Sequence, residues 1–172
     1  LPLQGLPTKN QQLTKTMARI DDYRQAKKIA VETLSRKSFD ELVQHSGFES
    51  PDKNIFRIPF LNRVYQVGFP DFDFQDESEQ EKEVPIQEQV MILHYLIGSA
   101  HAGQVSQKRI AYREIPGASF YFSAFVKRAI DPLKKVFGQN IQGLVKAAAQ
   151  LGGKKIEPGD AGFEFNVFPK LP

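Results

Sequence analysis

The sequence predicts an α+β fold in which a small antiparallel sheet, built around a β-hairpin, packs against several helices. Apolar residues recur at helical spacing in several segments, whereas they alternate as in a strand over residues 55–69. Hydrophobic residues make up 41% of the 172 residues, which is enough for a folded core, and no internal repeat is visible. We therefore expect a flexible tail or linker over residues 1–17 and a single α+β domain over residues 18–172.

Two helices are expected after the tail. The first begins at about Ala18, because an apolar stripe follows at helical spacing, made of Tyr23, Ala26, Ile29, Ala30, Val31 and Leu34. The second is short. Ser38 and Glu41 stand three residues apart, as in a capping box, and Gly47 ends the segment as a C-terminal glycine does.

Residues 55–69 predict a β-hairpin. One face of its first strand carries Phe56, Ile58 and Phe60. We place the reversal at 61–63, because Asn62 tolerates the left-handed conformation that a tight turn needs. Pro59 has no N–H to donate, so its strand is expected to lie at an edge or to carry a bulge there.

A buried helix is expected over residues 86–97, and Pro85 suits its first turn. The apolar stripe is Ile86, Val90, Leu93 and Ile97, widened by Met91, Ile92, Tyr95 and Leu96. Beyond it we expect a short strand over 108–114 and a helical segment over 120–131. Pro132 then either starts a new helix or kinks this one.

The last predicted helix, residues 140–151, is capped by Asn140 and stopped by Gly152 and Gly153. Its buried stripe is expected to be Ile141, Leu144, Val145, Ala148 and Leu151. A final strand near 163–168 follows. We expect this strand to share one sheet with the 55–69 hairpin, and that sheet to pack against helices 86–97 and 140–151.

Charge is distributed unevenly along the chain. Residues 71–88 carry eight acidic groups and one Lys, whereas residues 103–138 carry seven basic and two acidic groups. We expect residues 75–83 to be an extended, mobile loop, because its carboxylates repel one another. The acidic and basic segments then form separate patches suited to steering a charged partner. Facing patches would instead make structural ion pairs.

Composition excludes several classes of function. Cysteine is absent, so disulfides, thiolate metal sites and a cysteine nucleophile are excluded within this chain. No apolar run is long enough to span a membrane, and no signal peptide is visible, so we expect a cytoplasmic protein. Nucleic-acid binding is not expected, because the basic residues are not interleaved with aromatic ones in any recognisable motif.

The strongest candidate binding region is the stretch 110–133, where charged groups stand among large aromatic rings. An anion site would use Arg113, Lys127 and Arg128, because an arginine fork binds two oxygens of a carboxylate or phosphate, and Tyr112 and Tyr121 would add hydroxyl donors. The alternative is structural ion pairing of Arg113 with Asp131 or of Glu114 with Arg128. The phenylalanines at positions 56, 60, 120, 122 and 125 are expected in the core.

His94 lies in the most apolar predicted helix. It is expected to be a core histidine with one hydrogen bond, and the functional alternative is a base or ligand. No phosphate-binding loop, nucleophile elbow or calcium loop is present, so we expect no metal site and no cofactor within this chain.

Several short blocks, in this order and spacing, resemble the domain of unknown function 3786 family of anaerobic bacteria and archaea. They cover about residues 20–172. The blocks are Ile58–Leu61 with Tyr65, Val84–Pro85, Leu93–Leu96, Tyr112–Gly117, Phe120–Tyr121, Phe125, Arg128–Ala129, Asp131–Leu133, Phe137–Gly138, Leu151–Gly153, Gly159–Asp160 and Phe168–Pro169.

The resemblance implies no reaction, because no activity is established for the family. Some members resemble fusions to a four-cysteine iron–sulfur domain similar to that of corrinoid iron–sulfur proteins, which implies anaerobic one-carbon or corrinoid metabolism. This chain has no such cysteines, so a metalloprotein partner would act in trans. The resemblance also implies that members continue past a motif like Phe168–Pro172 into further strands, so a C-terminal piece is expected to be missing here.

The sequence thus favours a non-catalytic accessory or binding module that works with a corrinoid or iron–sulfur metalloprotein. The alternative is a small enzyme whose acid–base and anion-binding pocket uses His94, Glu114 and Arg128. These three groups would then have to converge on one cavity, within reach of the same substrate.

Overall fold

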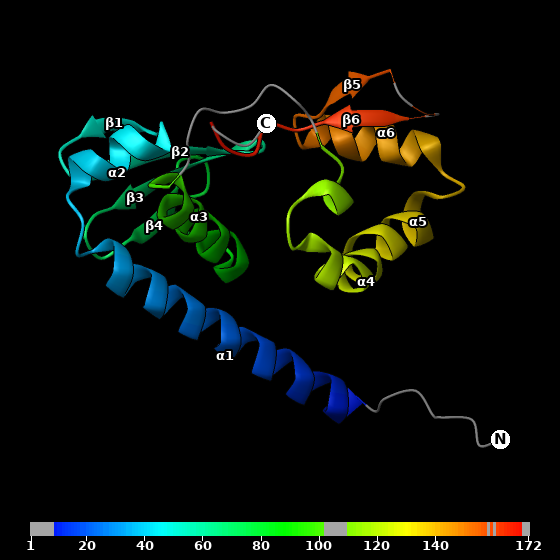
Figure 1. The fold of residues 1–172 in the computed structure, drawn as a ribbon, viewed down its shortest axis with the longest axis horizontal. Helices are drawn as coiled ribbons and strands as arrows, with labels where there is room; N and C mark the ends of the chain where they lie inside the picture. The colour runs from blue at the N-terminus through cyan, green and yellow to red at the C-terminus, as the bar shows by residue number, and fades with distance from the viewer. Residues whose placement is uncertain (1–8, 102–109, 158, 160, 170–172) are drawn as a thin grey trace. The chain divides into compact units, whose positions relative to one another are not determined.

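A computed structural model describes residues 9–101, 110–157, 159 and 161–169, with side chains from Arg19 onward. The predicted α+β fold class is confirmed (Figure 1). The chain divides into two compact units. Unit 1 comprises residues 1–102 with 168–170, and unit 2 comprises residues 103–167 with 171–172. The single domain expected over residues 18–172 stays a prediction, and each unit is described by itself.

Unit 1 contains a four-stranded antiparallel sheet in the order β1-β2-β3-β4. Its strands are β1 (Glu49–Asp52), β2 (Ile55–Phe60), β3 (Arg63–Gly68) and β4 (Asp73–Asp76). The predicted hairpin is confirmed, with β2 paired to β3 along its whole length. The positive φ of the reversal, 54°, belongs to Leu61, so the left-handed conformation expected at Asn62 was placed one residue too late.

The β2–β3 hairpin supplies the centre of the unit 1 core. Phe56 faces Val67 and Ile58 faces Tyr65 across the two strands, and these side chains are fully buried. Pro59 lies in an interior strand of the sheet. However, β1 pairs with β2 only as far as Arg57, so the proline falls beyond the covered part and no ladder bond is lost on that side.

Part of the acidic segment forms a strand rather than a loop. This part is β4, which pairs with β3 as the outer strand of the sheet. The buried Asp76 bonds to Arg63 at 3.2 Å, and Glu77 bonds to Arg57 at 2.9 Å. The loop prediction was wrong for residues 75 and 76, because the backbone there joins the sheet, whereas residues 77–83 do form a loop and its mobility stays a prediction.

Three helices belong to unit 1, namely α1 (Lys9–Leu34), α2 (Phe39–Ser46) and α3 (Ile86–Ser99). The first begins nine residues before the predicted Ala18 and therefore overlaps the expected tail. It packs against α3, where only Ala30 and Leu34 of the predicted stripe are buried. Whether residues 1–17 behave as a flexible tail stays a prediction.

The N-cap serine and the C-terminal glycine predicted for α2 are present. However, the carboxylate of Glu41 lies 3.8 Å from the amine of Lys37, and the second half of the predicted capping box is not observed in the described chain. Ser38 accepts the N–H of Glu41 at 3.2 Å, and Gly47 ends the helix with a φ of 74°, which a side chain rarely adopts. From α2, Phe39 packs on Phe56 of the sheet with 4.7 Å between ring centroids. The capping residues therefore set both ends of a helix whose Phe39 packs against the core of unit 1.

The chain returns to unit 1 at Phe168. Its ring stacks on Tyr95 of α3, with centroids 4.3 Å apart, and it also contacts Phe48 and Phe60. Phe168 is buried, and the neighbouring Pro169 approaches Gly47. Unit 2 is thus an excursion of the chain that begins after α3 and ends at an aromatic anchor in unit 1.

Unit 2 contains a run of helical turns. These are the 3-10 helices η1 (Tyr112–Glu114) and η2 (Ala118–Tyr121), then α4 (Phe122–Phe125), the π-helix η3 (Val126–Ile130), α5 (Asp131–Phe137) and α6 (Ile141–Gln150). The short strand expected over 108–114 was wrong for 112–114, which form η1, and residues 108 and 109 lie outside the described part. The helical prediction for 120–131 is confirmed.

Pro132 explains the change of helix type. A proline donates no N–H, and its ring collides with the carbonyl of the residue four positions before it, here Arg128. The chain widens into a π-helical turn, in which the N–H of Asp131 bonds to the carbonyl of Val126, and α5 follows it directly. The backbone stays helical at Ile130 and Asp131, so the proline is accommodated by the π-helical turn without a break before a new helix.

The C-terminal strand forms a sheet of its own. In unit 2, β5 (Lys154–Ile156) pairs antiparallel with β6 (Gly162–Glu164), with Lys155 opposite Phe163. The expectation that this strand shares a sheet with the 55–69 hairpin was therefore wrong. The pairing observed has a local cause, because β5 and β6 lie close in sequence and closing the loop between them costs little entropy.

Candidate functional site

Unit 2 buries few of its described side chains. Among its described residues, only Ala148 is buried, although α6 was expected to bury an apolar stripe. That expectation was wrong for Ile141, Val145 and Leu151, which remain 41–49% exposed. A helix with one apolar face normally packs that face against another element. Within unit 2 this face is only partly covered.

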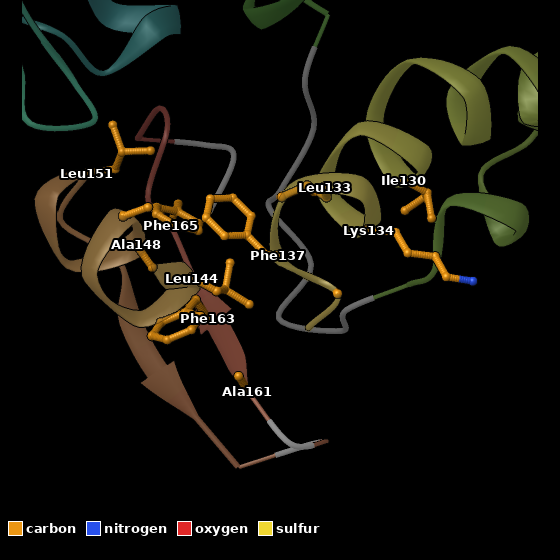
Figure 2. Close-up of a pocket in the computed structure, with 12 residues that line it drawn as sticks. Ile130, Leu133, Lys134, Phe137, Leu144, Ala148, Leu151, Ala161, Phe163 and Phe165 are labelled. Atoms are coloured by element: carbon orange, nitrogen blue, oxygen red, sulfur yellow. The ribbon is translucent and has the colours of Figure 1, made fainter. Parts of the chain in front are cut away.

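A pocket of about 570 Å³ opens in this apolar region (Figure 2). Its walls are side chains of α5, α6 and the β5–β6 hairpin, chiefly Leu133, Phe137, Leu144, Leu151, Phe163 and Phe165. Its volume lies within the range of roughly 300–1,000 Å³ that ligand sites occupy. Lys134 is the one charged residue in the lining, and Figure 2 shows its amine pointing away from the apolar side chains.

Local sequence signals position the walls of the pocket. Asn140 accepts the N–H of Gly143 at 2.8 Å, which starts α6 where predicted. At the other end, Gly153 leaves room for the ring of Phe165. A Cβ at Gly153 would lie 2.7 Å from that ring and 2.9 Å from the carbonyl of Ala148. The predicted helix stop is therefore also the place where the hairpin closes onto α6.

The charge of unit 2 is strongly positive. Residues 103–167 carry ten basic and five acidic groups, a net charge of +5. Four exposed cations lie on η3 and α5, and no carboxylate of the described chain lies within 4 Å of any of them. They are Lys127, Arg128, Lys134 and Lys135. We refer to these four residues as the basic group.

The candidate residues near 112–125 gather around aromatic rings. Tyr112 stacks on Phe125, with centroids 4.1 Å apart and planes at 5°. The guanidinium of Arg113 lies 4.1 Å from the ring centre of Phe122, where a cation–π contact holds it. The carboxylate of Glu114 turns back and accepts the backbone N–H of Ala111. These contacts give Arg113 and Glu114 local structural roles.

The predicted ion pairs of this region are not formed. In the described chain, Arg113 makes no salt bridge with Asp131, and Glu114 makes none with Arg128. The reason is that Arg113 rests on an aromatic ring and Glu114 caps its own turn. An anion site built from Arg113, Lys127 and Arg128 stays a prediction.

Tyr121 is exposed and contacts Phe120 edge to face, with centroids 5.1 Å apart. The core position expected for Phe120 was wrong, because its side chain is 83% exposed. Phe122 and Phe125 are half-buried, whereas Phe56 is fully buried as predicted. The signal that misled the prediction is aromatic content, which marks a binding surface as readily as a core.

His94 lies in α3 of unit 1, whereas Glu114 and Arg128 lie in unit 2. Its side chain is exposed, so the expectation of a core histidine was wrong. The single hydrogen bond expected for it is present, from Nδ1 to the carbonyl of Val90 at 2.9 Å. The exposure follows from helical geometry, because Leu93 and Tyr95 turn inward and the residue between them turns away.

A buried polar network in unit 1 was missed by the sequence reasoning. The hydroxyl of Tyr65 donates to the carboxylate of Glu88, joining β3 to α3. Burial, reinforced by this hydrogen bond, raises the pKa of Tyr65 well above its ordinary value. Bonds from the side chain and backbone of Ser78 lower the pKa of Asp76, and the guanidinium of Arg63 adds to this effect. The network ties the sheet together.

No signal in the sequence marked this network, because its members are distant along the chain. Among the described residues, no three His, Asp or Glu side chains are grouped so that they could hold a metal ion. None of the described helices is long and apolar enough to cross a membrane. Several of the exposed apolar side chains described in unit 2 line its pocket, which also has Lys134 in its lining.

Comparison with known families gives a match over residues 38–172 to the family described as "Domain of unknown function (DUF3786)". The chain belongs to the DUF3786 family. The match begins at the N-cap of α2 and therefore leaves out α1 of unit 1, whereas the predicted resemblance began near residue 20. No curated protein and no solved structure matches the chain. The DUF3786 assignment by itself carries no reaction.

Proposed function

We propose that this DUF3786 chain is a non-catalytic accessory or binding module and that unit 2 carries its binding surface. The observation that carries the proposal is the pocket of about 570 Å³, whose walls are apolar and whose helices leave large side chains exposed. Exposed apolar patches of this kind mark sites of association in folded proteins. Binding would bury them and stabilise unit 2.

The candidate polar residues support binding over catalysis. A catalytic acid or base needs to reach the substrate with its free hydrogen-bonding atoms. Glu114 instead accepts the N–H of Ala111, and Arg113 rests on Phe122. The pocket itself is lined by apolar groups, with Lys134 directed away from them. These contacts favour recognition of an apolar surface.

The partner that the family resemblance points to is a corrinoid or iron–sulfur metalloprotein of anaerobic metabolism, in the cytoplasm. The chain would then supply no cofactor of its own and would act on the partner in trans. The family resemblance alone supports this finer part of the proposal.

A photo-crosslinking amino acid at Leu133, in the pocket wall, tests the proposal in anaerobic cells that contain the natural partner. The matched control is the same group at Met91, which is equally exposed at 49% but lies in unit 1. We expect one discrete protein to be captured from position 133 and not from position 91. Iron or cobalt in the native complex would support the metalloprotein partner.

Two outcomes would contradict the proposal. Crosslinking of position 133 only to unit 1 of the same chain would mean that the pocket is closed internally. An experimental structure of the whole chain that places His94, Glu114 and Arg128 within about 8 Å of one another, around a shared cavity, would favour the enzyme instead.

A further inference from the structure

The helix α5 leaves large apolar side chains exposed within its own unit. It continues the helical turns of α4 and η3 without a gap, and its Leu133 and Val136 are 49% and 62% exposed. A surface that covers α5 would bury both side chains and stabilise the helix.

The shape of the pocket suits a helical occupant. Its opposite walls belong to α5 and to α6 with the β-hairpin, so the apolar space is bounded by elements rather than enclosed by a loop (Figure 2). Grooves of this type bind an amphipathic helix, whose apolar side chains at i, i+3 or i+4, and i+7 enter the groove. A planar surface would leave the concavity empty.

The charges select the kind of helix. The basic group on η3 and α5 has no carboxylate within 4 Å in the described chain; it consists of Lys127, Arg128, Lys134 and Lys135. A symmetric dimer through this face is disfavoured, because it would bring together two faces that each belong to a unit of charge +5. An acidic occupant would complement them.

We infer that the pocket face of unit 2 binds an acidic amphipathic helix of a partner protein. The apolar stripe of that helix enters the pocket beside Leu133 and Phe137, and its flanking carboxylates face the basic group. This inference rests on the proposed function and narrows it to the chemistry of the partner segment.

A display library of helical peptides tests the inference with the full-length chain as the target. Each peptide has 18 positions, with Leu or Phe on the apolar stripe and Glu, Gln or Lys varied at the flanking sites. We expect selection to enrich Glu at the flanks. The Glu-flanked peptide should bind about tenfold more tightly than its Lys-flanked counterpart at about 50 mM salt, and this ratio should shrink at about 500 mM, where charges are screened.

Two charge-reversed variants separate local pairing from net charge. In the first, the basic group is changed together to Glu, at Lys127, Arg128, Lys134 and Lys135. In the control, four exposed cations of unit 1 are changed to Glu, at Arg19, Lys28, Arg36 and Lys53. We expect the first to lose or invert the Glu preference, and the control to keep it, although both variants carry the same net charge.

Equal affinity for Glu-flanked and Lys-flanked peptides, or no binding to either, would overturn the inference. So would self-association through Leu133 in sedimentation, or binding to phosphatidylserine vesicles without any peptide preference. If the crosslinker at Leu133 captures a partner while the library shows no Glu preference, the binding module stands and the acidic helix is wrong. The two failures are therefore distinguishable.

Discussion

Removing the aromatic anchor at Phe168 should destabilise unit 1, although the residue is far from its partners in sequence. Its ring is 5% exposed, stacks on Tyr95 at 4.3 Å, and contacts Phe48 and Phe60. Truncation of a buried Phe to Ala typically costs about 3–5 kcal/mol. We expect the lower end of this range, about 3 kcal/mol, for Phe168→Ala.

For a chain of this size, about 3 kcal/mol corresponds to a fall in Tm of roughly 6–12 °C. Urea unfolding followed by near-ultraviolet circular dichroism of the tyrosines measures the loss, and hydrogen exchange locates it. Exchange should rise in α3 and β2, which the anchor contacts. The matched control is Phe120→Ala, because Phe120 is 83% exposed and its truncation should change stability by less than about 0.5 kcal/mol.

An equal effect of the Phe168→Ala and Phe120→Ala substitutions would refute the reasoning. It would mean that the end of the chain does not complete the core of unit 1. A second substitution, Phe168→Leu, should restore part of the loss, since Leu refills some of the cavity but cannot stack on Tyr95.

Three further predictions follow from the packing and the buried polar groups. Because the pKa of Asp76 is lowered in the folded state, its contribution to stability is present above about pH 4 and lost as pH falls. In urea titrations, Asp76→Asn should therefore lose less stability than the wild type between about pH 5 and pH 2. Parallel curves of unfolding free energy against pH for the two proteins would contradict this. Because the pKa of Tyr65 is raised in the folded state, its contribution to stability is present below about pH 10 and lost as pH rises. Tyr65→Phe should cost about 1–2 kcal/mol at neutral pH and remove a tyrosine that ionises above the ordinary range in absorbance titrations; a high-pH titration unchanged by the substitution would disprove this. Gly153→Ala should destabilise unit 2 by about 1–3 kcal/mol, because the added Cβ meets an aromatic ring at 2.7 Å. Its control, Gly98→Ala, adds a Cβ in open space within a helix and should stabilise α3 by about 0.5–1 kcal/mol, so equal effects on the thermal midpoint would refute the contrast.

The charge distribution shows where sequence reasoning stops. The acidic segment was expected to repel itself into a loop, but its carboxylates pair with Arg57 and Arg63, which precede it in the chain and lie in β2 and β3. Net charge per segment does not reveal such pairing, since it depends on strand register. Whether the acidic segment of unit 1 and the basic segment of unit 2 form separate patches remains a prediction.

The candidate site, too, was predicted only in part from the sequence. The sequence directed attention to residues 110–133, and Ile130 and Leu133 of that stretch line the pocket. It did not predict the pocket, because every apolar stripe was assumed to be buried. Periodicity shows that a helix such as α6 has an apolar face, but it cannot show whether the chain contains enough neighbouring surface to cover that face.

Local chemistry by itself determined the elements. Ser38 and Gly47 set the ends of α2, alternation over residues 55–69 set a hairpin, and Asn140 set the start of α6, because each signal acts over a few residues. Only the tertiary structure decided how these elements combine. It separated β6 from the hairpin sheet, brought Phe168 back to Tyr95, and left the α6 stripe uncovered, because such choices depend on contacts between distant segments.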